Sequence, residues 1–579
     1  MKVLTLPHND VHRKVWTLLL IVVIGTRLAQ AGEIFVSHCN DSGAGSLREA
    51  ISSANTQPGY DHIIIQPSTG RILLNSALPT IKTELRIDGA GRDAMIIDAN
   101  GLNQVSVFRI DGASVTLCGL SMVHGRGYGG SEGIGKPAGG GILSMRTVSL
   151  RLLHCRIQSN QAEWGGGMFV EDGNLWIEHC ILEDNQATNT AKTGQGGGIY
   201  CSARTANLVA TMIASRITAN QADSAGGGIY VKGYKNASGT IYSSTVNLDA
   251  CTLSANQSSI NGGGIFNELY GVVNVWRSTF SANTCLYDGG GIFNQNGGTF
   301  IATNSTLSGN WANRYGGGIE AIGTTTMDYC TVVNNVADYD CNSTGKGGGV
   351  DQTIGTCRLF RCLVANNTLG NGSSNNTAGT ITTTNCFIGT TTLLGPLAGN
   401  GGETQTHALL EGFVAAIDQA GQSGGAGGFD QTGTTRPQGS ADDIGAFEYS
   451  ANKPPSITEG DSITVLMSED GLPTAFNLTL HASDADGDGL TWSIATQASH
   501  GTAIASGTGE TKAISYTPEA NYHGSDSFVV RVEDGQGGSD SIIVNVEIEA
   551  VNDAPNLTEG DTITVSMSED GSPTAFALT

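Results

Sequence analysis

Three aspartates at alternate positions are the residues of this chain best suited to chemistry. Asp484, Asp486 and Asp488 lie in a short run interleaved with Ala and Gly. Carboxylate oxygens are the ligands that a hard divalent cation such as calcium prefers. An EF-hand loop would also need Glu at its twelfth position, which is Ala495 here, so that motif is excluded. The run predicts a calcium site, with a solvated Asp/Gly turn as the alternative.

Further acids of the same region could complete such a site. Glu469, Asp534 and Asp553 lie within the same stretch of about one hundred residues and are the other candidate metal ligands. Unpaired carboxylates at neighbouring modules repel one another, and a bridging cation would remove that repulsion. We therefore expect calcium as the cofactor of this region and expect it to stiffen the chain.

The acids must be positioned by a β-sandwich. Alternating strands such as 527–532 and 541–548 are separated by Gly and Asp turns, which is typical of a module of about 100 residues. Residues 456–479 recur as 556–579, identical at 18 of 24 positions. We predict one β-sandwich at 450–551 and the start of a second, truncated repeat at 552–579, in a fragment of a longer array.

The motifs of this region resemble those of bacterial cadherin-like, Ig-like tandem repeats. They are the Asp484 run, Tyr516-Thr517-Pro518, Asp526-Ser527-Phe528, Asp534-Gly535 and 551–555. The resemblance implies calcium bound by acids near the junctions between modules. It also implies a role in cell adhesion.

The preceding part of the chain repeats with a shorter period. Eight Gly-Gly-Gly triplets run from Gly139 to Gly349 at intervals of 26 to 36 residues. Insertions fall at fixed corners between them, as in stacked repeats, and the segments are rich in Gly, Thr, Val and Ile rather than helix formers. The pattern predicts an all-β fold with a right-handed parallel β-helix over 61–395.

A second register supplies the β-helix core. In each coil a Cys or Ser is followed five residues later by Asn, as in Cys155 and Asn160. We expect the Cys/Ser positions to be small and buried, with most cysteines free, and the Asn side chains to form a hydrogen-bonded ladder. The pairing of the cysteines outside this register is left open by the sequence: Cys39, Cys201, Cys285, Cys341 and Cys357.

One row of aromatic residues is the candidate binding face of the β-helix. The residue two places after each glycine triplet is aromatic in five consecutive coils: Phe169, Tyr200, Tyr230, Phe266 and Phe293. If this position points outward, the rings form an exposed ribbon that could stack on sugars or a partner protein. The alternative is that the rings stack on one another beneath the corner loops.

The ends of the chain indicate export. Residues 1–31 read as a signal peptide, 32–60 as an N-terminal cap of the solenoid and 396–449 as a C-terminal cap. The SLREAI start at 46–51 and the DIGAFE end at 443–448 resemble segments that bracket right-handed parallel β-helix proteins of bacterial surfaces, the latter a choice-of-anchor Q domain. The resemblance implies secretion or surface display. No segment after the signal peptide is long and apolar enough for a transmembrane span.

The charge and motif pattern favours binding over catalysis. A net charge of -24 over 579 residues argues against a nucleic-acid partner. No nucleophile motif or repeated carboxylate pair is present, so no catalytic residue is predicted, although β-helices also host polysaccharide lyases and hydrolases. We expect a secreted or cell-surface, adhesin-like protein whose partner is a polysaccharide or a cell-surface protein. A polysaccharide-degrading enzyme with a carbohydrate-binding outer face is the alternative.

Overall fold

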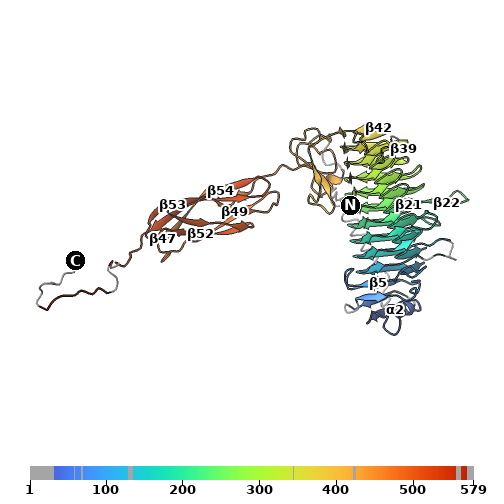
Figure 1. Cartoon of the computed structure of the whole chain (residues 1–579), viewed down its shortest axis with the longest axis horizontal. Helices are drawn as coiled ribbons and strands as arrows, with labels where there is room; N and C mark the ends of the chain where they lie inside the picture. The colour runs from blue at the N-terminus through green and yellow to red at the C-terminus, as the bar shows by residue number, and fades with distance from the viewer. Residues whose placement is uncertain are drawn as a thin grey trace, which may run out of the picture. The chain divides into compact units, whose positions relative to one another are not determined.

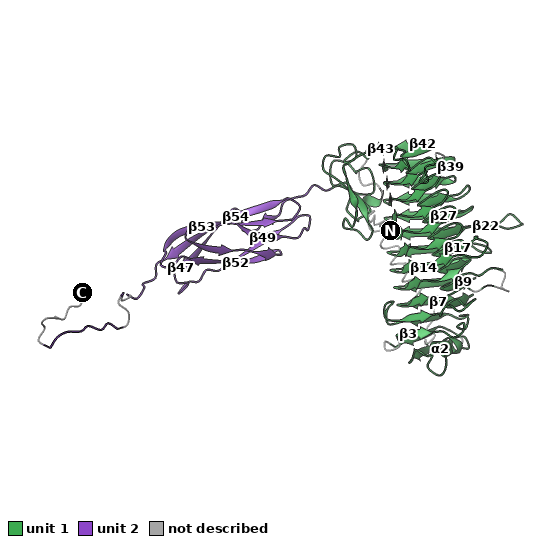
Figure 2. Cartoon of the chain, viewed as in Figure 1, with its two compact units in different colours: residues 1–449 green, residues 450–579 purple. Residues whose placement is uncertain are grey.

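The computed structural model describes residues 32–57, 59–66, 70–127, 129, 135–342, 345–421, 426–555, 558 and 562–569. The signal-peptide segment and most of the second repeat lie outside these residues. Residue contacts divide the chain into two units, 1–449 and 450–579 (Figure 2). Within the described residues, no helix is long and apolar enough to cross a membrane.

The first unit is a parallel β-helix whose coils stack one upon the next (Figure 1). One ladder of strands runs its whole length, and each strand pairs in parallel with the equivalent strand of the next coil. Its strands are β1 (Gly32–Val36), β2 (Asp61–Ile65), β4 (Leu85–Asp88), β7 (Ser114–Cys118), β10 (Ser149–Leu153), β14 (Gly173–Glu178), β18 (Leu208–Ile213), β24 (Ser244–Asp249), β28 (Gly271–Trp276), β32 (Thr299–Thr303), β36 (Thr324–Asp328), β39 (Val350–Phe360) and β42 (Thr377–Thr384).

A second ladder follows the Cys/Ser position of each coil. It has twelve strands. They are β3 (Arg71–Leu73), β5 (Ile96–Asp98), β8 (Ser121–Val123), β11 (Arg156–Gln158), β15 (Ile181–Glu183), β19 (Arg216–Thr218), β25 (Thr252–Ser254), β29 (Thr279–Ser281), β33 (Thr306–Ser308), β37 (Thr331–Val333), β40 (Leu363–Ala365) and β43 (Phe387–Gly389). The central residue of each strand from β5 to β40 is buried in the main core, as the period-2 pattern predicts.

Two shorter ladders complete the cross-section. The third contains β12 (Gln161–Ala162), β16 (Gln186–Ala187), β20 (Gln221–Ala222), β26 (Gln257–Ser258), β30 (Thr284–Cys285), β34 (Trp311–Ala312), β38 (Val336–Ala337) and β41 (Thr368–Leu369). The fourth follows the glycine triplets and contains β6 (Phe108–Asp111), β9 (Ile142–Met145), β13 (Met168–Glu171), β17 (Ile199–Ser202), β21 (Ile229–Lys232), β27 (Ile265–Asn267), β31 (Ile292–Asn294) and β35 (Ile319–Ala321). The first and fourth ladders join through the long strand β39.

The asparagines form the expected ladder inside the corner between the second and third ladders. The Nδ2 amide of Asn220 donates to Oδ1 of Asn256 at 3.0 Å, and its own Oδ1 accepts from the backbone and side-chain nitrogens of Asn185 at 3.1 and 2.9 Å. Both neighbours and Asn220 itself are fully buried. Each buried amide therefore has a hydrogen-bond partner in the next coil, as buried polar groups require.

The glycine triplets are needed where successive coils approach most closely. Gly165 has φ +62, a conformation that residues with a Cβ rarely adopt. A Cβ on Gly166 would lie 2.4 Å from backbone atoms of Gln186 in the next coil, and one on Gly167 would lie 2.7 Å from the carbonyl oxygen of Gly198. The first glycine of the triplet thus permits the turn, and the other two permit close contact with the backbone of the next coil.

All twelve cysteines are free thiols. Cys155 forms no disulfide with Cys180 in the next coil. The backbone nitrogen of Cys155 donates a hydrogen bond to the sulfur of Cys180 at 3.2 Å. Of the five cysteines outside the register, Cys201, Cys285 and Cys357 are buried, whereas Cys39 and Cys341 are exposed. Burial raises the pKa of Cys201 to about 12, so this thiol stays protonated and serves as a small apolar side chain.

The N-terminal lid is the helix α2 (Leu47–Ala54). Ser46 is its N-cap, and the Ser46 hydroxyl accepts a hydrogen bond from the backbone nitrogen of Glu49 at 3.2 Å. The Glu49 carboxylate accepts a hydrogen bond from the backbone nitrogen of Gly45 at 2.7 Å. Leu47 and Ile51 are fully buried against the first strands. This helix covers apolar core that the first coil would otherwise expose.

The C-terminal segment of the first unit lies along the flank of the β-helix (Figure 1). It includes the strand pair β44 (Leu394–Ala398) and β45 (Thr406–Leu409). The segment binds the outward threonines of the second ladder: Thr279 donates to Gln405, Thr306 donates to Gln431, and Thr331 accepts from the nitrogen of Ala446. The segment expected as a C-terminal cap at 396–449 therefore covers this threonine row.

The second unit is a β-sandwich. One sheet has the order β46 (Ser456–Ile457), β48 (Leu478–Ser483), β52 (Thr511–Pro518) and β50 (Gly501–Ile504). The other has β47 (Ser462–Ser468), β54 (Ser539–Glu549), β53 (Gly524–Glu533), β49 (Thr491–Thr496) and β51 (Gly507–Thr508). Trp492 and Phe528 are 1 % exposed between the sheets. The fold class is therefore a parallel β-helix followed by an Ig-like β-sandwich.

Candidate functional sites

The aspartate run forms a tight turn at the N-terminal end of the β-sandwich. Oδ1 of Asp484 accepts from the backbone nitrogens of Asp486 and Asp488 at 2.7 and 3.2 Å. The second oxygen of Asp484, Oδ2, is buried and has no hydrogen-bond partner among the described residues. A buried carboxylate oxygen without a donor is costly, so a cation or donor that reached this oxygen would lower that cost.

Asp534 joins this turn from the end of β53. Its carboxylate accepts from the amide of Asn452 at 2.8 Å and from the nitrogen of Gln536 at 2.7 Å, and the Asn452 bond leads the effects that lower its pKa. Desolvation raises the pKa of Asp488, and the nearby charges of Asp484, Asp534 and Asp486 raise it further. The four carboxylates are thus close enough to repel one another.

Asp486 forms hydrogen bonds and an ion pair with Lys453. Its carboxylate accepts from the backbone nitrogen of Lys453 at 2.6 Å and from the Lys453 ammonium at 3.2 Å. Within the described residues, no three His, Cys, Asp or Glu side chains are already arranged to hold a metal. Asp484, Asp488 and Asp534 carry carboxylates, the donor type that a hard cation prefers, and Oδ2 of Asp484 has no hydrogen-bond partner among the described residues, whereas Asp486 pairs with Lys453.

Glu469 and Asp553 lie at the opposite end of the module. Oε1 of Glu469 accepts from the backbone nitrogen of Val551 at 2.6 Å, where the chain leaves the sandwich, and its other oxygen lies 3.7 Å from the ring of His523. Asp553 is exposed just beyond that point. The structure therefore separates the six candidate ligands into one group at each end of the module.

The five aromatic rings of the β-helix form a buried stack. Neighbouring rings lie 4.7 to 5.3 Å apart, and the side chains are between 1 % and 8 % exposed. Trp164 stacks on the first rings at 6.2 and 5.6 Å, and corner residues such as Ala138 and Ala225 pack on the row. Of the two arrangements that the sequence left open, the structure shows rings stacked beneath the corner segments and not an exposed ribbon, so Phe169, Tyr200, Tyr230, Phe266 and Phe293 do not form a binding face.

The aromatic row ends in a buried pair of acids. Glu320 and Asp351 take the next two positions of the stack and are 1 % and 4 % exposed. The hydroxyl of Thr353 donates to both, at 2.8 and 3.1 Å. Burial and the Asp351 charge raise the pKa of Glu320 to about 9, so at neutral pH this carboxyl holds a proton.

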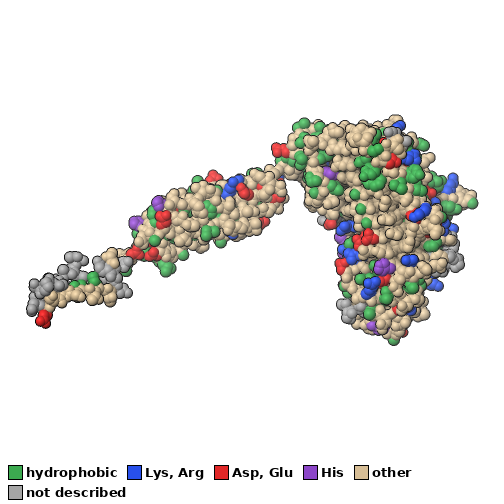
Figure 3. Space-filling view, viewed as in Figure 1, with side chains coloured by type: hydrophobic (Ala, Val, Ile, Leu, Met, Phe, Trp, Pro, Cys, Tyr) green, Lys and Arg blue, Asp and Glu red, His purple; other side chains and the backbone are tan. Residues whose placement is uncertain are grey.

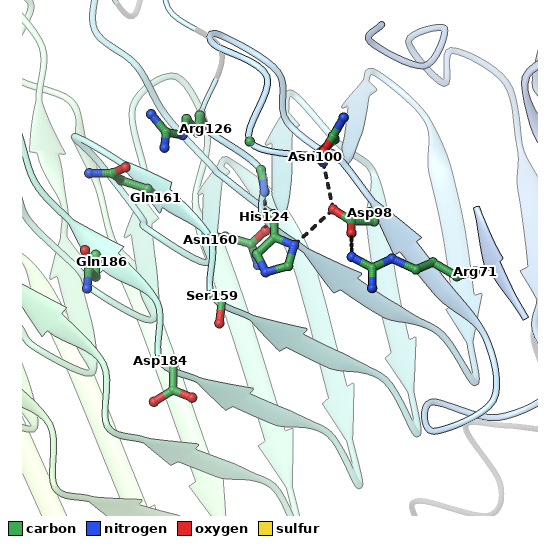
Figure 4. A pocket seen from close by; sticks show the side chains of 12 residues that line it. Arg71, Asp98, Asn100, His124, Arg126, Ser159, Asn160, Gln161, Asp184 and Gln186 are labelled. Carbon is green, nitrogen blue, oxygen red and sulfur yellow. Dashed lines mark hydrogen bonds and ion pairs between the residues drawn. The ribbon is translucent and has the colours of Figure 1, made fainter. Parts of the chain in front are cut away.

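An open, polar pocket of about 630 Å³ lies at the corner of the first coils (Figure 4). Asp98, at the end of β5, is 1 % exposed and pairs with the guanidinium of Arg71. Its other oxygen accepts from the nitrogen of Asn100 at 2.7 Å and from Nδ1 of His124 at 3.0 Å. The buried carboxylate therefore orients one imidazole and one guanidinium at the pocket wall.

The imidazole of His124 is neutral at physiological pH. Burial, and then the positive charge of Arg71, lower its pKa below the ordinary value despite the Asp98 hydrogen bond. Since Nδ1–H donates to Asp98, Nε2 carries the lone pair and can accept a hydrogen bond from a ligand. His124, Ser159 and Asp184 occupy the same left-handed corner position in three successive coils, with φ of 56, 55 and 55. Sequence reasoning missed this pocket because its first coils precede the glycine triplets.

Comparison with known proteins identifies only the second unit. Residues 452–547 match the family model of the bacterial Ig domain. No curated protein matches the chain. One solved structure, "Geobacillus virus E2 - ORF18", aligns over 98 % of this chain and 86 % of that chain at 13 % identity, with a TM-score of 0.33, too low to support any argument. Bacterial Ig-like domains are typical of extracellular or surface proteins.

Proposed function

We propose that the chain is an adhesin-like protein of a bacterial surface. The β-helix presents a rigid binding face, and the Ig-like repeats extend or tether it. The support for surface location is the Ig-domain match at 452–547 together with the sequence that recurs from 556 onward. A stack of coils that satisfies its own polar groups can hold a long surface in fixed geometry.

Calcium is part of this proposal. The observation that carries it is the buried Oδ2 of Asp484, which lacks a partner among the described residues while Asp488 and Asp534 stand nearby. When bound, a calcium ion would neutralise these carboxylates, with Asp484, Asp488 and Asp534 as its ligands. Glu469 and Asp553, at the other end of the module, would contribute to the equivalent junction with the next repeat.

Calorimetric titration of the full chain with calcium tests this proposal. We expect saturable binding that weakens at least tenfold in Asp484→Asn and Asp488→Asn, because each loses a charged ligand. Asp461→Asn is the matched control, since Asp461 is an exposed acid outside the group. Equal heats for all four proteins, or no binding at millimolar calcium, would contradict the calcium part of the proposal.

A second candidate function is a polysaccharide-degrading enzyme. The observation that favours it is His124, a neutral imidazole held by the buried Asp98 carboxylate in an open pocket. Such an imidazole can accept a proton from a sugar. Incubation with polysaccharides, followed by measurement of new reducing ends, tests this activity; release that persists in His124→Gln would rule out His124 as the base.

A further inference from the structure

A row of glutamines runs from the pocket along the outside of the β-helix. The first residue of four consecutive strands in the third ladder is glutamine, and each pairs in register with the next. They are Gln161, Gln186, Gln221 and Gln257. Gln161 is half-buried and the other three are exposed. The first two line the pocket, so the row and the pocket form one continuous surface.

Arg126 occupies the same row one coil earlier. Strands β8 and β11 pair Val123 with Gln158, and three further residues along each chain place Arg126 opposite Gln161. The backbone nitrogen of Gln161 donates to the oxygen of Gly125, as that of Gln186 donates to Asn160. Arg126 is exposed and, within the described part of the chain, makes no ion pair. Figure 4 shows Arg126, Gln161 and Gln186 in line beside His124.

The row ends on an aromatic platform. After Thr284, the next residue in register is Trp311. Its ring stacks on that of Tyr339 with centroids 4.4 Å apart and an interplanar angle of 22°. Tyr339 is 52 % exposed and Trp311 is half-buried. Unlike the covered rings of the fourth ladder, this pair reaches solvent.

We propose that the row from Arg126 to Trp311 is a binding track for a linear, carboxylate-bearing polysaccharide, with an acidic sugar at Arg126 and a sugar ring on the Trp311–Tyr339 platform. Coils stack at about 4.8 Å, so the five register steps from Gln161 to Trp311 span about 24 Å. A surface of that length suits an extended oligomer rather than a single sugar.

Each part of the track matches a part of such a ligand. An Arg guanidinium binds a carboxylate through two parallel hydrogen bonds. Glutamine amides offer both donors and acceptors, as sugar hydroxyls do, and the neutral Nε2 of His124 adds an acceptor. An aromatic pair offers a flat apolar surface for the C–H face of a sugar ring. From Arg126 to Thr284 the described residues of the row are polar, unlike the apolar side-chain pockets that bind peptides, and the acidic chain disfavours nucleic acid.

The overall negative charge does not prevent binding of an acidic sugar at Arg126. On the face shown in Figure 3, acidic and basic side chains are interspersed over the first unit rather than gathered in one field. Charges farther away than about 10 Å are largely screened at 0.1 M salt. Among the Arg and Asp side chains that line the pocket, Arg71 pairs with Asp98 and Asp184 lies two coils beyond Arg126. Arg126, which makes no ion pair among the described residues, is therefore the guanidinium left for an acidic sugar.

This inference deepens the proposed function, because it names the ligand class of the binding face, but its residues all lie in the first unit. The proposed calcium ligands all lie in the second unit, between Glu469 and Asp553. Removal of calcium with a chelator is therefore expected to leave sugar binding unchanged. Failure of one proposal is thus distinguishable from failure of the other.

Isothermal titration of the full chain with a galacturonate hexamer tests the track. We expect binding that weakens about tenfold or more in Arg126→Gln, which loses a charge-assisted pair, and severalfold in Gln221→Leu, which loses one amide in mid-row. Arg358→Gln and Gln536→Leu are matched controls, because both residues are exposed and lie off the row. They are expected to bind as the unmodified chain does.

Three outcomes would overturn the inference. The first is no galacturonate binding by a chain whose melting temperature shows that it is folded. The second is equal binding by Arg126→Gln or Gln221→Leu and the unmodified chain. The third is that a control ligand binds as tightly as the galacturonate hexamer. Equal binding of maltohexaose would mean that the track does not recognise the carboxylate, and equal binding of a hexaglutamate peptide would mean that it does not recognise the sugar.

Discussion

The β-helix and the Ig-like module place their polar groups in opposite ways. In the β-helix, Asn220 and its neighbours are fully buried, and each amide is bonded to the next coil. In the module, the polar cluster lies at the end, and Oδ2 of Asp484 is buried without a partner among the described residues. A stack of coils satisfies its polar groups internally, whereas a module in an array leaves groups at its ends for a ligand or neighbour. From this difference we propose that the β-helix is rigid without a ligand and that the stability of the module depends on one.

The largest expected effect is on the asparagine ladder. Asn220→Ala removes hydrogen bonds to Asn256, Leu182 and Asn185, leaving buried groups unpaired. We expect a loss of about 3 kcal/mol in the free energy of unfolding of the β-helix. Urea denaturation followed by circular dichroism measures it. Gln257→Ala, which changes the exposed residue directly after the ladder residue Asn256, is the control. Equal losses of stability in both variants would mean that the ladder hydrogen bonds do not stabilise the β-helix.

The next effect concerns the flank segment. Arg436 and Glu448 form a fully buried ion pair, with N–O distance 2.6 Å, and the guanidinium lies over the ring of Tyr329. Arg436→Met leaves the Glu448 carboxyl buried without its partner, which costs about 3–5 kcal/mol. Hydrogen exchange is expected to rise in residues 430–448 and not in the coils around Asn220. Unchanged exchange at 430–448 would show that the pair does not hold the segment to the β-helix.

A smaller effect is the pH dependence of the first unit. The pKa of Glu320 is about 9 in the folded chain against an ordinary value of 4.5, so the folded state binds more protons between these values. Stability therefore falls as pH rises from about 5 to about 9. Melting temperatures across this range are expected to fall less steeply in Glu320→Gln. A residual slope is expected, because burial also raises the pKa of Asp443 to about 6 and of Glu448 to about 7. If the melting temperature depends on pH with the same slope in both proteins, the raised pKa of Glu320 is wrong.

The smallest effect is the repulsion within the module's acidic end. Without calcium, Asp488→Asn removes one of four neighbouring carboxylates, and we expect the module to gain up to about 1 kcal/mol, since the group is solvent-accessible. Thermal melting in a chelator at low salt measures this gain. In millimolar calcium the sign is expected to reverse, because a ligand is lost. A variant that is less stable in both conditions would mean that the carboxylates do not repel.

Positions that repeat at a fixed offset could be predicted from sequence, because their role depends only on residues of the same coil and of the next one. The Cys/Ser, Asn and glycine registers recur in each coil, so they define the ladders, the core and the free thiols. The aromatic row was also found, but the sequence left open whether the rings are exposed or lie beneath the corner loops, because period-2 alternation says only that a side chain points outward from the coil. Whether a corner segment then covers it depends on non-repeating residues such as Trp164.

The residues of the proposed binding track also repeat at a fixed offset, but the sequence pattern did not identify them as a binding surface. A glutamine directly follows the ladder asparagine in four consecutive coils, a repeat that is visible in the sequence but marks neither a core nor an aromatic position. The pocket at its end could not be predicted, because Arg71 and Asp98 come from coils without the triplets and meet His124 only through the fold. The docking of 394–449 on the threonine row likewise depends on contacts between segments more than 100 residues apart.

Differential scanning calorimetry of the full chain, with and without calcium, tests most directly the claim that the two units differ in ligand dependence. The account predicts two transitions, of which the one that Asp488→Asn alters rises by several degrees in millimolar calcium while the β-helix transition stays in place. A calcium shift of the β-helix transition, or no shift of either transition, would contradict it.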